Sequence, residues 1–235
     1  MARDFDGTND NLLSADNAMT GMNVASKTIC FWEVRDTDSP SPDAVIAGLP
    51  SNGGTRTWAV VNFAPAVAGY KMQFSQDWTT TDGTWRTTND TTLNTRHFHA
   101  VTYNRGGAAP GNDPIFYVDG AVDASSEIGT PAGSVVTGDD TLKVGENSGG
   151  GDDLDGTLQH IAIYPSILSA GDLNRCMWWG RGQGGAVAYH PLVTTKLDDE
   201  GSAGETLTAN GTTVAAFATP VVRPGTAMMG MGVGW

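Results

Sequence analysis

Short runs of β-forming residues, separated by turn residues, recur along most of this 235-residue chain. The clearest run covers residues 97–103, where every second side chain would share one face of a strand. Glycine is abundant, with 31 residues, and the pair Asp119-Gly120 is typical of the tight turn of a hairpin. Short strands punctuated in this way predict an all-β, antiparallel β-sandwich of two sheets.

The strands that we expect are short and span most of the first 165 residues. They are 5–13 with a polar turn, 27–34, 45–49, 57–63, 70–74, 97–103, 115–118 with its hairpin into 121–122, 141–145 and 157–164. Residues 78–90, rich in Thr and Asp, are expected to form a loop. A single short helix is expected after Ser169, which suits an N-cap position because Asp172 follows three residues later.

Five phrases follow one another in a fixed order along the chain. They are FDGTND at 5–10, RHFHAVTY at 96–103, IFYVDG at 115–120, LDGTLQHIAIY at 154–164 and LSAGDL at 168–173. Together they resemble the laminin-G-like branch of the concanavalin A-like lectin/glucanase superfamily. The resemblance implies a jelly-roll sandwich with one short helix. It also implies a role in binding or scaffolding more often than in catalysis.

The chain is expected to form one domain, 1–220, in which residues 180–220 return to pack on the sandwich beside the N-terminal strand. Some 35 residues are too few to bury a core of their own. Residues 221–235 form an apolar tail rich in Gly and Met. A disordered terminus is one interpretation of this tail. The other is a partner-binding segment with Met228, Met229, Met231 and Trp235 as contacts, since Met and Trp adapt well to interfaces.

The sequence gives no pattern for catalysis. A glycosidase needs two carboxylates on either side of the scissile bond, and the glucanase phrase Glu-x-Asp-x-x-Glu does not occur; Glu33-Val34-Arg35-Asp36 comes nearest. His97 and His99 would share a strand face, as a metal or acid/base pair or as packed structural residues; we favour the second. No nucleophile motif and no phosphate loop is found, so we expect no enzymatic activity and no catalytic residues.

The net charge of −13 argues against nucleic acid or an anionic membrane as partners. No apolar run reaches the roughly 20 residues of a membrane span, and no signal peptide precedes the first strand, so we expect synthesis in the cytoplasm. Cys30 and Cys176 lack the spacing of a zinc site. They are either two buried free thiols, which we favour, or a disulfide.

Two kinds of binding site are open. The family resemblance implies a Ca²⁺ site with Asp6, Asn9, Asp10 and Asp155 as ligands, although Asp-Gly pairs also form turns without metal. Trp78 and Trp85, in the expected loop, are candidates for stacking on a carbohydrate; the alternative is burial in the core or in an interface.

The sequence thus predicts a non-enzymatic structural protein of a virion, decorating a capsid or associated with a tail. This rests on the resemblance to stand-alone domains among tailed-phage structural proteins. Its partners would be other virion proteins or copies of itself, and its location the virion. The alternative is a lectin-like carbohydrate-binding module that recognises surface glycans, either with or without Ca²⁺.

Overall fold

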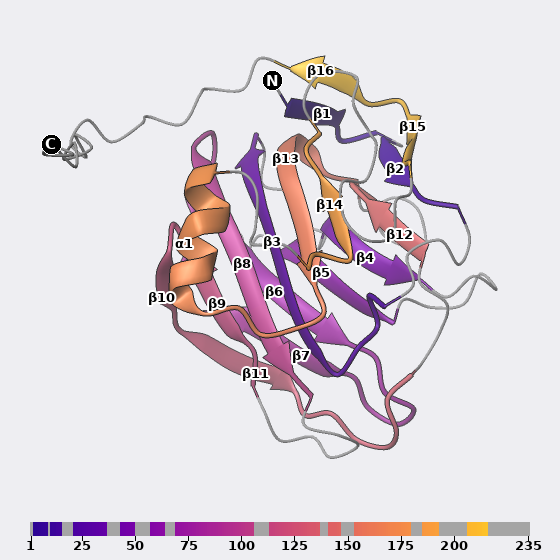
Figure 1. Ribbon diagram of the computed structural model, residues 1–235, viewed down its shortest axis with the longest axis vertical. Helices are drawn as coiled ribbons and strands as arrows, with labels where there is room; N and C mark the ends of the chain where they lie inside the picture. The colour runs from indigo at the N-terminus through magenta and orange to yellow at the C-terminus, as the bar shows by residue number, and fades with distance from the viewer. Residues whose placement is uncertain are drawn as a thin grey trace, which may run out of the picture.

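The computed structural model shows two antiparallel β-sheets packed face to face, with one short helix outside them (Figure 1). It describes residues 2–8, 10–15, 21–36, 43–49, 57–63, 69–105, 113–136, 141–146, 153–179, 185–192 and 206–215. All statements below concern these residues. The expected sandwich and its helix are therefore confirmed.

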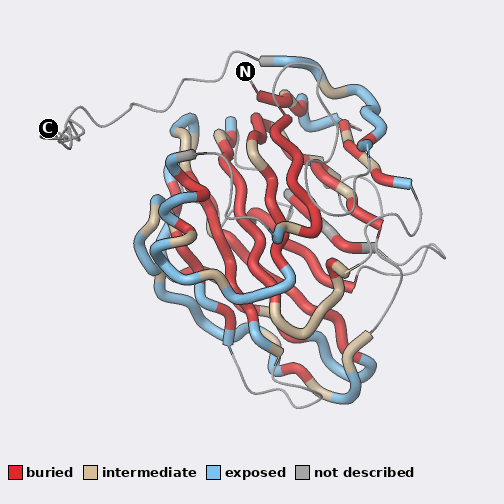
Figure 2. Tube along the Cα trace, viewed as in Figure 1, coloured by how far each residue is buried: buried red, intermediate tan, exposed pale blue. Residues whose placement is uncertain are grey.

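The first sheet has the strand order β10-β9-β8-β3-β13-β1-β16, and β14 also pairs with β13. Its strands are β1 (Ala2–Asp6), β3 (Ser26–Arg35), β8 (Arg96–Asn104), β9 (Ile115–Val118), β10 (Ala121–Asp123), β13 (Asp155–Tyr164), β14 (Ala188–His190) and β16 (Thr213–Ala215). The long strands β3, β8 and β13 form its centre, and buried residues run along them (Figure 2).

The second sheet has the order β11-β7-β6-β5-β4-β12-β2-β15. Its strands are β2 (Asn11–Leu13), β4 (Asp43–Leu49), β5 (Trp58–Phe63), β6 (Lys71–Gln76), β7 (Gly83–Thr87), β11 (Ser125–Gly129), β12 (Thr141–Val144) and β15 (Thr208–Asn210). Each strand runs antiparallel to its neighbours.

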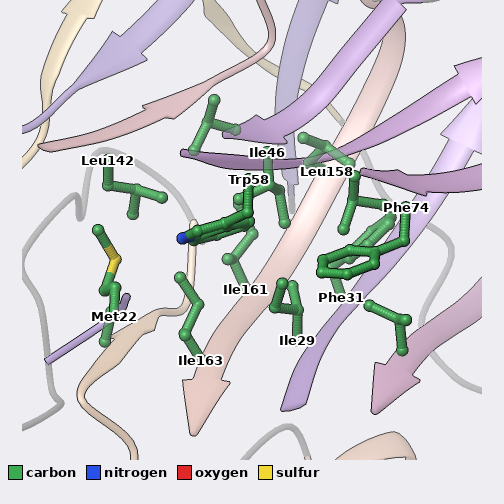
Figure 3. Close-up of a cluster of buried hydrophobic side chains, with 14 of the residues drawn as sticks. Met22, Ile29, Phe31, Ile46, Trp58, Phe74, Leu142, Leu158, Ile161 and Ile163 are labelled. Atoms are coloured by element: carbon green, nitrogen blue, oxygen red, sulfur yellow. The ribbon is translucent and has the colours of Figure 1, made fainter. Parts of the chain in front are cut away.

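Alternation along the central strands divides the apolar residues between two cores. On β3, Ile29 and Phe31 face the second sheet and join the main core around Trp58 (Figure 3). On β8, the predicted alternation is confirmed, because Val101 and Tyr103 also belong to this core. The intervening residues of both strands form a second apolar cluster beneath the helix α1 (Ala170–Trp179).

A bulge in β13 divides the strand that carries the later part of the chain. His160 has a positive φ of 53°, and the register with β3 shifts between Gln159 and Ala162. Before the bulge β13 pairs with β1, and after it with β14. Of the later strands, β15 pairs with β2 and β16 with β1. β1, from the start of the described chain, and β14, from its later part, thus pair with successive parts of β13.

Two details differ from the sequence-based expectations. The segment 5–13 is not one strand: β1 lies in the first sheet and β2 in the second, joined across Gly7, which has a φ of 75°. The segment 78–90 is not only a loop, because it contains β7, which pairs with β6 and β11. The α1 helix follows the prediction: Ser169 Oγ accepts from the backbone N–H of Asp172 at 3.2 Å.

Gly156 on β13 provides a test of the pairing between β13 and β3. Its φ is +151°, and a Cβ atom there would lie 2.2 Å from the carbonyl oxygen of Val34 on β3. We expect Gly156→Ala to lower the free energy of unfolding by at least about 2 kcal/mol, because backbone atoms cannot move aside cheaply. Urea unfolding of the two proteins measures the difference.

Gly171 is the matched control, since a Cβ there would meet only Ser169 Oγ at 3.7 Å. Gly171→Ala should be neutral or stabilise by about 0.5–1 kcal/mol, because alanine restricts the unfolded chain. Equal effects of the two substitutions would contradict the close approach of β13 and β3.

Candidate functional site

A cluster of buried polar side chains joins the two sheets. Glu33 on β3 accepts a hydrogen bond from the side-chain amide of Asn62 on β5, across the sandwich. Tyr70, just before β6, hydrogen-bonds His99 Nε2 on β8 at 2.9 Å, and that nitrogen lies 3.5 Å from Glu33 Oε2. None of the four side chains is more than 1% exposed. The cluster therefore connects strands of both sheets inside the molecule.

Burial controls the protonation of this cluster. It raises the pKa of Glu33 to about 7, although Arg35 and the hydrogen bonds from Asn62 and Tyr70 act in the opposite direction. Burial, together with the charge of His97, lowers the pKa of His99 to about 3. Near neutral pH His99 is therefore uncharged, and no solvent-borne substrate reaches either group.

The neighbouring His97 has a different environment, although it shares the strand face of His99. The two ring centroids are 6.1 Å apart. His97 Nδ1 lies 2.8 Å from a carboxylate oxygen of Asp119, and Nε2 lies 2.9 Å from Thr92 Oγ1. Because a carboxylate only accepts, Nδ1–H donates to Asp119, while Nε2 is hydrogen-bonded to the Thr92 hydroxyl. The histidines thus form no common metal or acid/base pair here.

The turn between β9 and β10 fixes Asp119. Its backbone φ is 51° and that of Gly120 is 81°, as the predicted two-residue hairpin requires. Its second carboxylate oxygen accepts from the backbone N–H of Phe98 at 2.9 Å. Burial opposes ionisation, but the hydrogen bonds from His97 and Phe98 hold the pKa of Asp119 below its ordinary value.

His97 lies in an open pocket of about 270 Å³. Its walls come from β8, β9, β10 and the segment that precedes β8; the lining residues are Asn89, Asp90, Thr91, Thr92, His97, Val118, Ala121, Val122 and Asp123. Asn89 Nδ2 donates to Asp123 Oδ1 at 2.5 Å, which joins two walls. Thr91 exchanges two backbone hydrogen bonds with Tyr70, at 3.1 and 2.7 Å. The pocket therefore adjoins the buried cluster.

The predicted sugar-stacking residues are not on the surface, so this expectation is wrong. Trp78 is 4% exposed and Trp85 is 2% exposed. Trp85 belongs to β7, where it packs against Phe74 and Tyr103 and donates its indole N–H to Asp113 at 2.8 Å. Gly83, Trp85 and Thr87 alternate toward the interior of the sandwich, which accounts for the burial.

The structure brings three of the four predicted calcium ligands to one end of the sandwich. Asp6 and Asp155 are opposite each other in the β1–β13 ladder. Asp6 Oδ1 accepts from Thr8 N–H, and Asp10 Oδ2 accepts from Asp6 N–H, contacts that are typical of turns. Burial and the nearby Asp6 raise the pKa of Asp10. Asn9 lies outside the described residues.

Within the described ranges, no group of three or more His, Cys, Asp or Glu side chains has an arrangement that could hold a metal ion. Calcium binding therefore remains a prediction. The predicted partner contacts Met228, Met229, Met231 and Trp235, and the division at residue 220, also lie outside the described residues. No helix in the described part of the chain has the length and hydropathy to cross a membrane.

The sequence did not reveal the pocket. Its residues come from four separate segments of mixed polarity, and neither the alternation of 97–103 nor the turn at Asp119-Gly120 indicates that these segments meet. Their proximity depends on the register of β8 with β9, where His99 is opposite Val118, and on the hairpin that places Ala121 opposite Val118.

Comparison with protein families gives a match between residues 6–174 and the model of the concanavalin A-like lectin/glucanases superfamily. No curated protein sequence matches the chain. Among solved structures, the native heptameric SAP-like pentraxin from Limulus polyphemus is similar, with a TM-score of 0.60 and 11% identity, covering 92% of this chain and 94% of the pentraxin.

Two other similar structures come from bacteria. A putative carbohydrate binding protein from Bacteroides ovatus has a TM-score of 0.65 and 13% identity, over 93% of this chain and 61% of its own. Domain 4 of an extracellular arabinanase from Geobacillus stearothermophilus, in complex with arabinotriose, has a TM-score of 0.51 and 14% identity, over 73% and 74%. At these identities the likeness establishes the fold.

The buried carboxyl group predicts a distinctive pH dependence. Glu33 keeps its proton to about pH 7 when folded, against 4.5 for an ordinary glutamate, so the folded state loses stability as pH rises through this range. Glu33→Gln removes this loss. We expect the free energy of unfolding of the variant, relative to the wild type, to increase by about 3 kcal/mol between about pH 4 and pH 8.

His99 acts in the opposite direction, since its lowered pKa adds stability as pH rises from about 3 toward 6.5. Both proteins contain His99, so its contribution largely cancels in the difference. Urea titrations at several pH values provide the measurement. Parallel stability curves for the two proteins would show that Glu33 is ionised in the folded state.

The calcium prediction is tested by calorimetry. If Ca²⁺ binds the native state, millimolar Ca²⁺ should raise the melting temperature by about 5 °C or more relative to EDTA. Asp155→Asn should remove the shift, whereas Asp123→Asn, outside this end of the sandwich, should retain it. Equal melting temperatures with Ca²⁺ and with EDTA would leave the Asp-Gly pairs as turns alone.

Proposed function

Because the chain belongs to the concanavalin A-like lectin/glucanase superfamily, we propose that it is a non-enzymatic binding module whose pocket around His97 takes a neutral sugar. The observation that carries the proposal is the composition of this pocket. Amide, carboxylate and hydroxyl groups surround a small apolar wall. Sugar recognition requires this combination, because a sugar presents hydroxyl groups and apolar C–H faces together.

The polar groups of the pocket match the hydroxyl groups of a sugar. A carboxylate such as Asp123 accepts hydrogen bonds from hydroxyls, and the Asn89 amide both donates and accepts. Val118 and Val122 supply the apolar contact, and Val122 is 67% exposed in the free protein. The volume of about 270 Å³ is at the lower limit of small-molecule sites and suits one or two sugar residues.

The charge of the pocket selects the class of sugar. Asp90 and Asp123 line it, and Asp119 lies behind His97. Neither Lys nor Arg is among the lining residues. Anionic sugars such as sialic or uronic acids would meet like charges, which costs affinity. The pocket therefore favours neutral sugars, and it disfavours phosphorylated ligands for the same reason.

The buried cluster supports a role in binding and not in hydrolysis. Glu33 begins the segment Glu33-Val34-Arg35-Asp36, which is the most similar to the glucanase phrase, and its side chain is buried between the sheets. In the pocket, His97 is held by Asp119 and Thr92, so neither ring nitrogen is directed at a bound ligand. Two of the similar structures, the Bacteroides ovatus protein and the arabinotriose complex, show that proteins described as binding carbohydrate use this fold.

The proposal is tested with a glycan array and then by calorimetric titration of the best neutral ligand. Asp123→Ala should weaken binding about tenfold or more, because it removes an acceptor and releases Asn89. Val122→Asp should also weaken binding, since it adds a negative charge to the apolar wall. Ile128→Asp is the matched control, because Ile128 is exposed, at 55%, and lies on β11 outside the pocket lining.

Unchanged affinity in Asp123→Ala and Val122→Asp would place the ligand elsewhere. Preference for sialylated over neutral glycans would contradict the argument from charge. Repeating the titration with EDTA distinguishes a calcium-dependent lectin from a calcium-independent one.

The virion role predicted from the sequence remains a separate proposal. Its predicted contacts lie outside the described residues, so no geometry supports it. Co-purification of the chain with particles at a fixed stoichiometry would support this role, and a free monomer in lysates that contain particles would contradict it. A component of a virion that binds surface glycans would satisfy both proposals.

A further inference from the structure

The helix α1 is fixed on the outer face of the first sheet by two adjacent contacts. The indole N–H of Trp32 donates to the backbone carbonyl of Met177 at 3.2 Å. Two residues earlier on β3, the side chain of Cys30 lies in the same buried apolar cluster as Cys176 on α1, where the two thiols interact. Alternate residues of a strand share a face, so the neighbours Cys176 and Met177 lie over Cys30 and Trp32. Figure 1 shows α1 over this sheet.

Both thiols are enclosed by the second apolar cluster. Cys30 is 1% exposed and Cys176 is 4% exposed. Tyr164 on β13 lies above the same face, with its hydroxyl 3.7 Å from Cys176 Sγ. No group of three or more His, Cys, Asp or Glu side chains within the described residues could hold a metal ion, so the two sulfurs are not part of a described metal centre. The polar neighbours of Cys176 Sγ are therefore the thiol of Cys30 and the hydroxyl of Tyr164.

The two thiols differ in acidity. The hydrogen bond from Cys30 and the one from Tyr164 stabilise a thiolate on Cys176, and they lower its pKa against the effect of burial. The same interaction, together with burial, raises the pKa of Cys30. A thiolate is the attacking species in disulfide exchange. Cys176 is the less buried of the two thiols and lies beside the Tyr164 hydroxyl, so it would react first.

We propose that Cys30 and Cys176 form an oxidisable dithiol whose disulfide clamps α1 to the first sheet. A small-molecule disulfide such as oxidised glutathione is the oxidant. The Cys176 thiolate attacks one of its sulfurs, forming a mixed disulfide and releasing one glutathione thiolate, which takes up a proton. Cys30 then loses its proton and attacks Cys176 Sγ, displacing the second glutathione. Two thiols are oxidised, and one glutathione disulfide is reduced to two thiols.

The position of the pair gives the clamp a large effect on stability. A bond between residues 30 and 176 closes a loop that contains most of the sandwich, and closing a long loop restricts the unfolded chain most. The clamp also acts close to the pocket: a Cβ on Gly120 would lie 2.6 Å from Asn174 Oδ1 and 3.3 Å from Met177 on α1. The inference does not depend on the proposed sugar binding.

The experiment uses the full-length native protein, incubated with oxidised glutathione and then denatured in the presence of an alkylating reagent. Intact-mass spectrometry should show the loss of two hydrogen atoms, no retained glutathione and no alkylated cysteine. The melting temperature of the oxidised protein should rise by about 5–10 °C, and reduction should reverse the rise.

The variant Cys30→Ala should retain one glutathione on Cys176, because the second step has no attacking thiol. The variant Cys176→Ala should react much more slowly, because Cys30 is buried and less acidic. Wild-type protein that keeps both thiols, or that retains glutathione without forming the internal disulfide, would overturn the proposal. So would a disulfide that forms only in urea. The wild-type measurement decides the question even if a variant does not fold.

Discussion

The hydrogen bond between Asn62 and Glu33 connects two apolar sheet faces that could otherwise slide over one another. Apolar packing fixes the distance between sheets but discriminates weakly between nearby alignments, whereas a buried polar contact requires one geometry to be satisfied. His99 and Tyr70 add a second crossing beside it. Because an unsatisfied buried carboxyl is costly, the cluster favours the alignment in which β3, β5 and β8 stand as observed. The pocket residue His97 depends on this alignment, since it lies two positions before His99 on β8.

The division of the apolar residues between two cores explains where the helix lies. Odd-numbered residues of β3, such as Ile29 and Phe31, enter the main core, which leaves the even-numbered residues on the outer face. A sheet that is apolar on both faces needs a cover on each. The second sheet covers one face, and α1 covers the other through Leu173, Cys176 and Met177. The contact between the two thiols is a consequence of this cover.

Local signals in the sequence predicted those parts of the fold that local interactions decide. The alternation in 97–103 and the Ser169–Asp172 cap required only neighbouring residues, and both are confirmed. Trp85 was misjudged because its neighbours Thr84 and Arg86 are polar. Their side chains point outward from β7 while Trp85 points inward. The pocket could not be predicted, since its walls meet through strand register and through the contact of Thr91 with Tyr70.

The close packing of the two sheets, which stabilises the sandwich, also separates Glu33 and His99 from solvent. A carboxyl beside a histidine is a common pair in acid–base catalysis, but here Glu33 and His99 lie in a dry interior. Burial keeps His99 uncharged near neutral pH and delays the ionisation of Glu33 to about pH 7. The groups that face solvent, around His97, are already engaged with Asp119 and Thr92. Polar groups held in place, such as Asn89 and Asp123, can orient a ligand without exchanging protons with that ligand. The arrangement therefore suits recognition, in which a rigid set of acceptors and donors is an advantage because little order is lost on binding.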